Sequence, residues 1–552
     1  MNITIDGRTQ SFSSPVSTLA AARSLWGDEA ELMLGFFLGG RVLDREEVLR
    51  EDTQLRGIRF DNEEGRRIYE RSLRFLFLLA AKRVFPHVQV RIEHSIGQGI
   101  YIHLQGMRLT MADVARLEEE MRHIVSQDLP YKRHTWTRER AVRYFTENGD
   151  LDKAKLMGYR TKDDLTMYEC GGLYDYFYGV MLESTGKVPV FALRWRAPGV
   201  VLRLPDPRDP TQVAPYMPAT KNMAAFAQSN YWCDVLGYST AAELNDLVAQ
   251  DRLRDFIRVN EAFHDKSLSE IAESIANSNA RAIFIAGPSS SGKTTFANRL
   301  SIHLRVLGYR PVILSMDDFY IDRHLIPLEE DGKPDLEALS ALDVGHFKEC
   351  LASLLAGELT LLPRFSFKTG RREEKGVYMR VDHLQPLIIE GIHGLNPALH
   401  AGFDPQLLFK IYISQLTCIN LDNHSRIRTT DARLLRRIVR DYQFRATPPG
   451  QTLAMWDSVR RGEEKWIFPY QEQVDVVFNS ALHYELPVLK TISYDILSQV
   501  TPDDPNYIKC SRILKILDYF LPATEADIRE IPPLSILREF IGGNTLYEGM
   551  TH

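Results

Sequence analysis

The chain has 552 residues, 44% of them hydrophobic and 25% charged, with a formal net charge of −6. This length suggests about three or four domains, and the acidic balance gives no reason to expect general affinity for nucleic acids or anionic membranes. No apolar stretch reaches the roughly 18 residues of a membrane span, and the five scattered cysteines form no CxxC pair. We therefore expect a cytoplasmic protein with reduced thiols, without disulfides or a zinc site.

Residues 1–60 have the pattern of a small β-rich domain. An alternating strand, Ile3-Thr4-Ile5, ends at an Asp6-Gly7 turn, and the apolar residues 34–38 precede a second turn. The order of these elements and the segment Gly39-Gly40-Arg41-Val42-Leu43-Asp44 resemble the TGS domain at the front of threonyl-tRNA synthetases. The resemblance implies a β-grasp-like fold for this segment.

Residues 61–196 contain an apolar helical stretch over 75–85 and the segment Tyr168-Glu169-Cys170-Gly171-Gly172. These features resemble the second N-terminal domain of the same synthetases, an α+β domain that hydrolyses mischarged tRNA. In this sequence the four metal-ligand positions of that editing site correspond to Arg71, Phe75, Cys170 and Tyr174. Only the cysteine can bind zinc. We therefore expect no editing chemistry, and a module that binds RNA or a regulatory ligand instead.

Residues 197–277 are expected to form a connector followed by helices. Six prolines between residues 197 and 221 argue against a helix or a central strand, and favour a stiff connector or a wrapped arm. Farther along, apolar side chains recur at helical spacing, for example at Leu244, Leu247 and Val248. We expect these helices to pack against the next domain.

Residues 281–300 combine an apolar strand, a glycine-rich turn and an amphipathic helix. The turn matches the phosphate-binding loop pattern GxxxxGK[ST]. Its glycines let backbone N–H groups converge on phosphate oxygens, Lys293 supplies a positive charge to the β- and γ-phosphates, and the Thr294 hydroxyl can ligate Mg²⁺. We predict a site for ATP, with Mg²⁺ as cofactor, formed by Gly287, Pro288, Ser289, Ser290, Ser291, Gly292, Lys293, Thr294 and Thr295.

Two further predicted strands end in carboxylates. Residues 312–314 lead into Asp317-Asp318-Phe319-Tyr320, and a later apolar run leads into Glu390-Gly391-Ile392. In a parallel sheet, residues just beyond the strand ends face the ligand crevice. Asp317 would then lie near the γ-phosphate and accept the proton of an attacking hydroxyl. The segment Glu390-Gly391-Ile392 resembles the Glu-Gly-Ile of uridine kinases, and this resemblance implies that Glu390 supports Mg²⁺, with Thr294 and Asp317 as further ligands.

The same segments resemble the uridine kinases, which pair a phosphate-binding loop with Asp-Ser-Phe-Tyr and a later Glu-Gly-Ile. The resemblance implies an α/β fold of the P-loop NTPase type, with a parallel sheet flanked by helices. It assigns substrate-binding roles to Tyr320, Glu337, Phe365 and Phe367. The tyrosine and histidine with which the family reads the base correspond here to Phe365 and Gly370, which leaves the identity of the base open.

Residues 426–445 carry seven arginines. At helical spacing, Arg433, Arg437 and Arg440 share one face, and leucine and isoleucine residues lie opposite. The stretch resembles the Arg-Arg-x-x-Arg-Asp lid of uridine kinases. The resemblance implies that Arg437, Arg440 and Arg445 bind the substrate phosphates and that Arg437 and Arg440 stabilise charge on the transferred group. The alternative is a solvated basic face or a nucleic-acid patch.

The last residues contain an amphipathic piece at 513–517 but no chemical motif, so they are expected to dock on the preceding domain or to form an oligomer contact. The sequence thus predicts a TGS-like segment, an α+β segment, a connector with helices, a kinase-like segment and a tail, which cover residues 1–60, 61–196, 197–277, 278–500 and 501–552.

The function that these patterns favour is ATP-dependent phosphorylation of a nucleoside 5′-hydroxyl, as in nucleoside salvage, with uridine as the expected acceptor and cytidine as the alternative. The expected catalytic residues are Asp317, Lys293, Arg437 and Arg440. Two other functions stay open: a P-loop kinase for another small hydroxyl metabolite, and an RNA-binding regulator that ATP switches. We expect a small-molecule nucleoside partner, no membrane partner, and a homo-oligomer.

Overall fold

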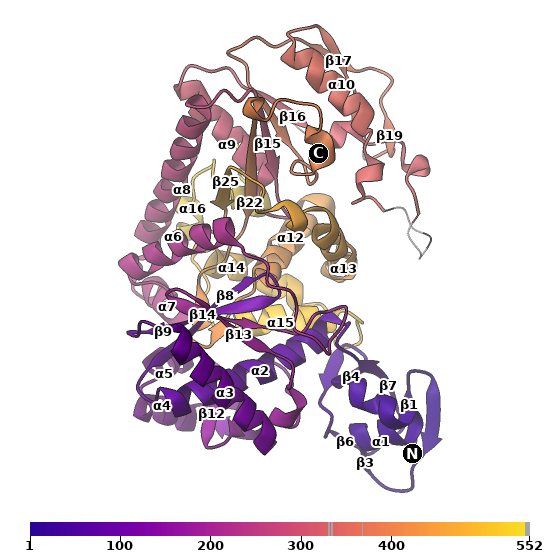
Figure 1. Cartoon of the computed structure of the whole chain (residues 1–552), viewed down its shortest axis with the longest axis vertical. Helices are drawn as coiled ribbons and strands as arrows, with labels where there is room; N and C mark the ends of the chain where they lie inside the picture. The colour runs from indigo at the N-terminus through magenta and orange to yellow at the C-terminus, as the bar shows by residue number, and fades with distance from the viewer. Residues whose placement is uncertain (329–331, 333–334, 367, 547–552) are drawn as a thin grey trace.

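The computed structural model describes residues 1–328, 332, 335–366 and 368–546, and it shows a mixed α/β molecule. Antiparallel and mixed sheets lie in the first 203 residues, and a parallel sheet lies in the C-terminal half. Figure 1 places the N-terminal elements at the bottom of the view and the parallel sheet at the top, with α6 and α8 along the side between them. Within the described ranges, every helix is too short or too polar to cross a bilayer.

Residues 1–60 form a five-stranded sheet in the order β2-β1-β7-β4-β5, against which helix α1 (Thr18–Trp26) packs. Ile3 and Ile5 of β1 are both buried beside Ala21 of α1, because alternate side chains of a strand point to the same face. The strands that the sequence predicts at residues 3–5 and 34–38 are present. The strands of this segment are β1 (Asn2–Ile5), β2 (Arg8–Ser11), β3 (Val16–Ser17), β4 (Gly35–Leu38), β5 (Arg41–Leu43), β6 (Val48–Leu49) and β7 (Thr53–Ile58).

The second segment is built around the long helix α2 (Glu63–Val84), which the Asn62 side chain caps by accepting from the N–H of Glu64. Most of α2 is buried, and Cys170 lies in the same apolar core. The other elements of this segment are β8 (Gln89–Ile96), β9 (Gly99–Gln105), α3 (Met111–Gln127), β10 (Lys132–Thr137), α4 (Arg138–Glu147), α5 (Leu151–Gly158), β11 (Asp164–Cys170), β12 (Leu173–Asp175), β13 (Ala192–Arg196) and β14 (Gly199–Arg203).

Strand β14 shows that the prediction of no central strand between residues 197 and 221 is wrong. It pairs antiparallel with β13 on one side and with β9 on the other, in the order β13-β14-β9-β8. Pro198 and Pro205 flank the strand, and no proline interrupts it, so its backbone N–H groups are free to bond to both neighbours. The prolines mark the ends of the strand, and the sheet continues past Arg196.

Three helices lead from this sheet to the C-terminal half, as the apolar spacing predicts: α6 (Thr220–Leu236), α7 (Ala241–Ala249) and α8 (Leu253–Ala276). Thr240 and Glu243 form a capping box at the start of α7. Leu244 and Leu247 are then buried in the large core that α7 and α8 share with the parallel sheet. The N-terminal and C-terminal halves are therefore joined by a continuous apolar interior.

The parallel sheet has the order β16-β21-β15-β22-β25, and every pair in it is parallel. Ile283 and Ile285 of β15 face the core that contains helices α9 and α12, whereas Phe284 faces helix α10. Helices on both faces of a parallel sheet confirm the predicted P-loop NTPase type of fold. These elements are β15 (Ala282–Ala286), α9 (Lys293–Val306), β16 (Val312–Ser315), α10 (Val344–Leu355), β21 (Leu387–Glu390), β22 (Leu408–Ser414), α12 (Thr429–Arg445) and β25 (Val476–Asn479).

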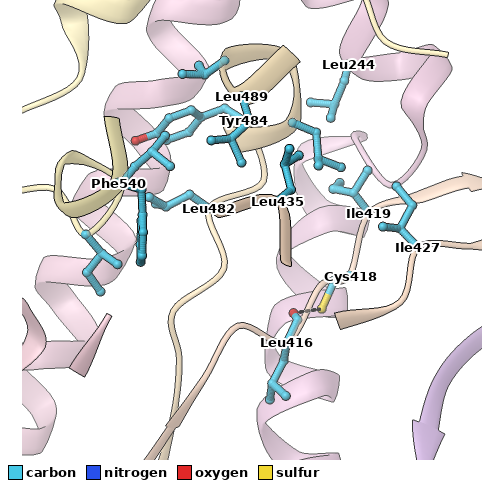
Figure 2. Packing of buried hydrophobic residues seen from close by; sticks show 14 of the residues in the cluster. Leu244, Leu416, Cys418, Ile419, Ile427, Leu435, Leu482, Tyr484, Leu489 and Phe540 are labelled. Atoms are coloured by element: carbon cyan, nitrogen blue, oxygen red, sulfur yellow. Dashed lines mark hydrogen bonds between the residues drawn. The ribbon is translucent and has the colours of Figure 1, made fainter. Parts of the chain in front are cut away.

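The C-terminal segment contacts both the N-terminal and the C-terminal half of the molecule. Figure 2 shows Phe540 beside Leu482 and Tyr484, in the apolar cluster that also contains Leu435 of α12. Farther back, the carbonyl of Pro502 accepts from the N–H of Gly40 at 3.2 Å. Among the described residues, the remaining elements are seven short 3₁₀ turns and β17 (Thr360–Leu362), β18 (Phe365–Ser366), β19 (Arg371–Arg372), β20 (Val377–Met379), α11 (Pro397–His400), β23 (Asn420–Asp422), β24 (Ser425–Arg426), α13 (Pro449–Trp466), α14 (Glu485–Ser498), α15 (Tyr507–Leu517), α16 (Glu525–Glu530) and α17 (Arg538–Ile541).

The hairpin β23–β24 of the C-terminal half is inserted into the second N-terminal segment. The N–H of Ile92 donates to the carbonyl of Asn423 at 2.7 Å. The hairpin leads directly into α12, whose Asp431 pairs with Arg67 of α2 at 3.2 Å and with Arg512 of α15 at 3.1 Å. Helix α12 therefore forms ion pairs with α2 of the N-terminal half and with α15 of the C-terminal segment.

The buried carboxylate of Glu70 provides a test of this junction. Burial alone would raise the pKa of Glu70, but Arg428 and Arg426 outweigh it and hold the pKa below its usual range. We expect Glu70→Gln to lower the free energy of unfolding by about 3–5 kcal/mol, because buried arginines lose their partner. Urea unfolding measures the loss.

The control for this variant is Glu270→Gln, which removes an exposed pair with Lys266. It should cost less than about 1 kcal/mol. If both variants unfold at the same urea concentration as the wild type, the Glu70 pairs do not hold the two halves together.

Candidate active site

The loop between β15 and α9 has the backbone shape that a phosphate-binding loop requires. A Cβ at Gly287 would lie 2.0 Å from the carbonyl oxygen of Ile413 on β22, so only glycine allows this close approach. Gly292, which caps α9, has a φ of +88°, a region that glycine enters without steric cost. The next residues, Lys293, Thr294 and Thr295, form the first turn of α9.

The loop presents two serine hydroxyls and a lysine ammonium that can bind an anion. The hydroxyls of Ser290 and Ser291 are buried and have no hydrogen-bond partner among the described residues, whereas buried polar atoms normally have one. The Lys293 ammonium donates to the carbonyls of Gly287 at 3.0 Å and Pro288 at 3.4 Å. A lysine and a helix N-terminus at one glycine-rich turn are suited to phosphate.

Ser289 joins the loop to two helices. Its N–H donates to Glu463 of α13 at 3.0 Å, and its carbonyl accepts from Arg433 of α12 at 2.9 Å. Its hydroxyl accepts from Arg437 at 2.7 Å. Arg433 and Glu463 are buried and pair with each other. Arg437 therefore lies against the loop, which is the position that a phosphate-binding arginine needs.

Two acids lie at the carboxyl ends of the strands beside the loop. Asp317 follows β16, and Glu390 ends β21, the strand between β16 and β15. Burial raises the pKa of Asp317, and the nearby positive charge of Lys293 opposes that shift. Burial also raises the pKa of Glu390, and the charge of Asp317 adds to it. Titratable groups with mutually shifted pKa values at a strand-end crevice are typical of a functional site.

Glu337 belongs to the same group of charges. Burial raises its pKa to about 7, against the positive charge of Arg437 and with the negative charge of Glu463. Its backbone is fixed by a hydrogen bond from its N–H to Asp335 at 3.1 Å. A Cβ at Gly462 of α13 would lie 2.7 Å from the Cβ of Glu337, so this carboxylate is held tightly against α13.

The predicted base-binding residues lie on a short hairpin. The ring of Phe365 on β18 lies 5.6 Å from the ring of Tyr320, centroid to centroid. The Tyr320 hydroxyl donates to the carbonyl of Leu336 at 3.0 Å, which links it to the segment of Glu337. Gly370 turns the hairpin with a φ of +68°. Phe367, which the sequence also assigns to the base, lies outside the described residues.

The remaining predicted arginines gather on one carboxylate. Arg437, Arg440 and Arg445 lie 3.3, 3.1 and 3.4 Å from the Asp441 oxygens. Burial lowers the pKa of Arg445, and its neighbour Arg440 adds to the shift. Three cations that share one carboxylate leave a net positive charge, which favours an anion beside the loop.

Sequence reasoning missed Glu463 and Arg372. Glu463 accepts a hydrogen bond from Ser289, which lies 174 positions away, and no local sequence motif predicts a contact of this range. Arg372 donates from its Nε to the carbonyl of Tyr320 at 3.0 Å and pairs with Asp343 at 3.1 Å, which fixes the hairpin. Asp441 did appear in the lid pattern, but a role as the shared partner of three arginines requires the helix geometry.

The pKa of Glu337 predicts a change of stability with pH. Its folded pKa of about 7 exceeds its ordinary value of 4.5, so the folded protein binds this proton more tightly than the unfolded chain. Stability should therefore fall as the pH rises through this window. We expect Glu337→Gln to raise the free energy of unfolding by about 1–3 kcal/mol at pH 8, and to change nothing at pH 4.

Urea unfolding at pH 4, 6 and 8 measures this difference. The control Glu349→Gln removes an exposed carboxylate on α10 and should follow the wild type at each pH. A constant difference between Glu337→Gln and the wild type at all three pH values would show that the Glu337 carboxyl does not titrate with a raised pKa.

The chain matches two groups of known proteins. Residues 282–486 match the model of the Phosphoribulokinase / Uridine kinase family. The N-terminal region is similar to threonine–tRNA ligases. That of Aromatoleum aromaticum is 31% identical over 195 residues, 35% of this chain and 31% of the ligase. That of Marinobacter nauticus is 30% identical over 190 residues, 34% of this chain and 30% of the ligase.

The chain thus spans less than a third of the length of these curated relatives. Among solved structures, that of a possible uridine kinase from Bacillus stearothermophilus is 20% identical, with a TM-score of 0.28, and the match covers 38% of this chain and 97% of that one. The loop, Asp317, Glu390 and Arg437 all lie inside residues 282–486. The chain therefore combines a C-terminal domain that matches the Phosphoribulokinase / Uridine kinase family over residues 282–486 with an N-terminal region that matches threonine–tRNA ligases.

Proposed function

We propose that this protein transfers the γ-phosphoryl group of ATP to the 5′-hydroxyl of a nucleoside, with uridine as the first candidate acceptor. The observation that carries the proposal is that Asp317 and Glu390 lie at the carboxyl ends of the adjacent strands β16 and β21, and that Lys293, at the start of α9 beyond the loop that follows β15, acts on the charges of both. Phosphoryl transfer asks a protein mainly for positioning and charge stabilisation, and these three groups with the arginines of α12 supply both.

In this proposal Asp317 acts as the general base. Burial raises its pKa, and a base whose pKa is closer to the working pH accepts a proton more effectively. Lys293 lies at the mouth of the loop and neutralises charge on the phosphates. Arg437, which is bound to Ser289, and Arg440 stabilise the charge that develops on the transferred group.

The residues present fit ATP and Mg²⁺. Ser290 and Ser291 hold buried hydroxyls without partners among the described residues, and the first turn of α9 offers N–H groups to phosphate. Thr294 with Glu390 or Asp317 would hold the ion, since Mg²⁺ is commonly bound through one or two carboxylates and the substrate phosphates. When bound, the ion neutralises phosphate charge.

Fewer residues support the identity of the acceptor than support the ATP site. Glu337 offers a carboxylate to ribose hydroxyls beside Arg437, and Tyr320 and Phe365 offer ring surfaces for a base. Phenylalanine at 365 and glycine at 370 supply no side-chain hydrogen bond to a base, which weakens discrimination between bases. Cytidine is therefore the second candidate, and another small hydroxyl metabolite is the third.

We also propose that residues 1–196 bind RNA or a regulatory ligand. The similarity of this region to threonine–tRNA ligases supports this proposal. The hairpin β23–β24 would connect such a ligand to the site, because it contacts the second N-terminal segment through Ile92 and Asn423 and continues directly into α12, the helix of Arg437. An ATP-switched RNA-binding regulator would show tight RNA binding that weakens steeply with salt.

The first test is ADP release with ATP and Mg²⁺ across uridine, cytidine, other nucleosides and small sugars, for the wild type and Asp317→Asn. We expect one nucleoside to stimulate turnover, and Asp317→Asn to lower kcat by about 10²–10⁴-fold, because the general base is lost. ATP binding without stimulation by any compound would contradict the kinase proposal and favour the regulator.

The second test removes the arginine that contacts the loop. We expect Arg437→Ala to lower kcat by about 10²–10³-fold, because a donor to the developing charge is lost. The control Arg254→Ala removes a partly exposed arginine in the first turn of α8 that pairs with Asp251, and it should leave kcat unchanged. Wild-type turnover by Arg437→Ala would exclude a role for this arginine in transfer.

A further inference from the structure

The C-terminal segment, for which the sequence offers no chemical role, reaches the phosphate-binding loop. Ile536 packs on Gly292 so closely that a Cβ at this glycine would lie 2.5 Å from the Cγ2 of Ile536. The Thr295 hydroxyl donates to the carboxylate of Glu539 at 2.7 Å. Thr295 lies in the first turn of α9. Glu539 is therefore placed at the helix end to which the loop would bind phosphate.

Buried contacts fix the segment in this position. Ser535, Ile536, Leu537 and Phe540 are at most 1% exposed. The Ser535 hydroxyl donates to Glu261 of α8 at 2.6 Å, and Figure 2 shows Phe540 inside the apolar cluster. The guanidinium of Arg436 lies 5.1 Å from the Phe540 ring. The backbone that carries Glu539 is thus part of the folded core.

The carboxylate of Glu539 acts on the charges of the site. Burial lowers the pKa of Arg445, and Glu539 acts in the opposite direction. Carboxylates and phosphates are both stabilised at helix N-termini, so a nucleotide phosphate and Glu539 would use the same features of α9.

We propose that Glu539 belongs to the nucleotide site and competes with the nucleotide phosphates for Thr295 and the start of α9. The inference rests on the proposed ATP site. Without nucleotide, the carboxylate accepts the hydrogen bond of Thr295. With nucleotide, two anions face each other at one helix end, or the Glu539 side chain turns away. In either case the C-terminal segment lowers the affinity for phosphorylated nucleotides.

The test is calorimetric binding of ATP, ADP and adenosine to the full chain, with Mg²⁺ and without any acceptor. Glu539→Gln keeps the size and the hydrogen-bond acceptor but removes the charge. We expect ATP and ADP to bind about tenfold more tightly to this variant. A negative charge next to another commonly shifts a pKa by about one unit, and one pKa unit corresponds to a tenfold change in an equilibrium constant. Adenosine, which has no phosphate, should bind as it does to the wild type.

The matched control is Glu525→Gln, which changes a carboxylate on α16 that is 91% exposed, and it should bind all three ligands as the wild type does. Glu539→Ala serves as a second variant if the glutamine disturbs the fold. Unchanged or weaker ATP binding by the Glu539 variants would overturn the inference. An equal gain for adenosine would overturn it as well, because it would not depend on phosphate.

These outcomes are separate from those of the proposed function. A gain in ATP affinity without any phosphorylated acceptor would contradict the proposed nucleoside kinase and leave the role of Glu539 standing. Turnover of a nucleoside with unchanged ATP affinity would do the opposite. Failure of the wild type and the variants to bind ATP would overturn both.

Discussion

The geometry of the site depends on the contacts of Ser289. Its N–H, carbonyl and hydroxyl bind Glu463, Arg433 and Arg437, so one loop residue is held by two helices. Behind it, the buried pair of Arg433 and Glu463 would leave an uncompensated charge if either partner were lost. The loop and the arginines of α12 therefore cannot shift independently, and in the proposed ATP site this linkage would fix Arg437 relative to the phosphates.

Helix α12 also belongs to a second network. Its Asp431 binds Arg67 of α2 and Arg512 of α15, and the hairpin before it lies in the second N-terminal segment. The part that matches the Phosphoribulokinase / Uridine kinase family and the ligase-like region thus form one packed unit, since they share buried charges and an apolar core. A ligand of the N-terminal region would change the proposed phosphate site only under one condition. The protein must have two conformations that differ in the position of α12, and the ligand must bind one of them more tightly than the other.

The parts of the fold that local patterns determine could be predicted. The loop, the parallel strands β15, β16 and β21 and the helix of Arg437 follow from glycine spacing, apolar runs and helical periodicity, whereas the neighbouring strand β22 was not predicted. Strand β14 could not, because the flanking prolines suggested a connector, whereas its five residues are proline-free. The contacts of Glu463 and Glu539 could not be predicted either, because their partners Ser289 in the loop and Thr295 in α9 lie 174 and 244 positions away. Contacts of this range follow from tertiary packing, which single-sequence periodicity does not encode.

The place of Ile536 and Glu539 in the chain has a consequence for biosynthesis. The phosphate-binding loop leaves the ribosome roughly 240 residues earlier than its last contacts, which at about 5–20 residues per second is an interval of many seconds. During that interval Thr295 has been synthesised and Glu539 has not. If the loop binds a nucleotide as we propose, the order of synthesis allows the nucleotide phosphates to bind at the start of α9 before the Glu539 carboxylate is present.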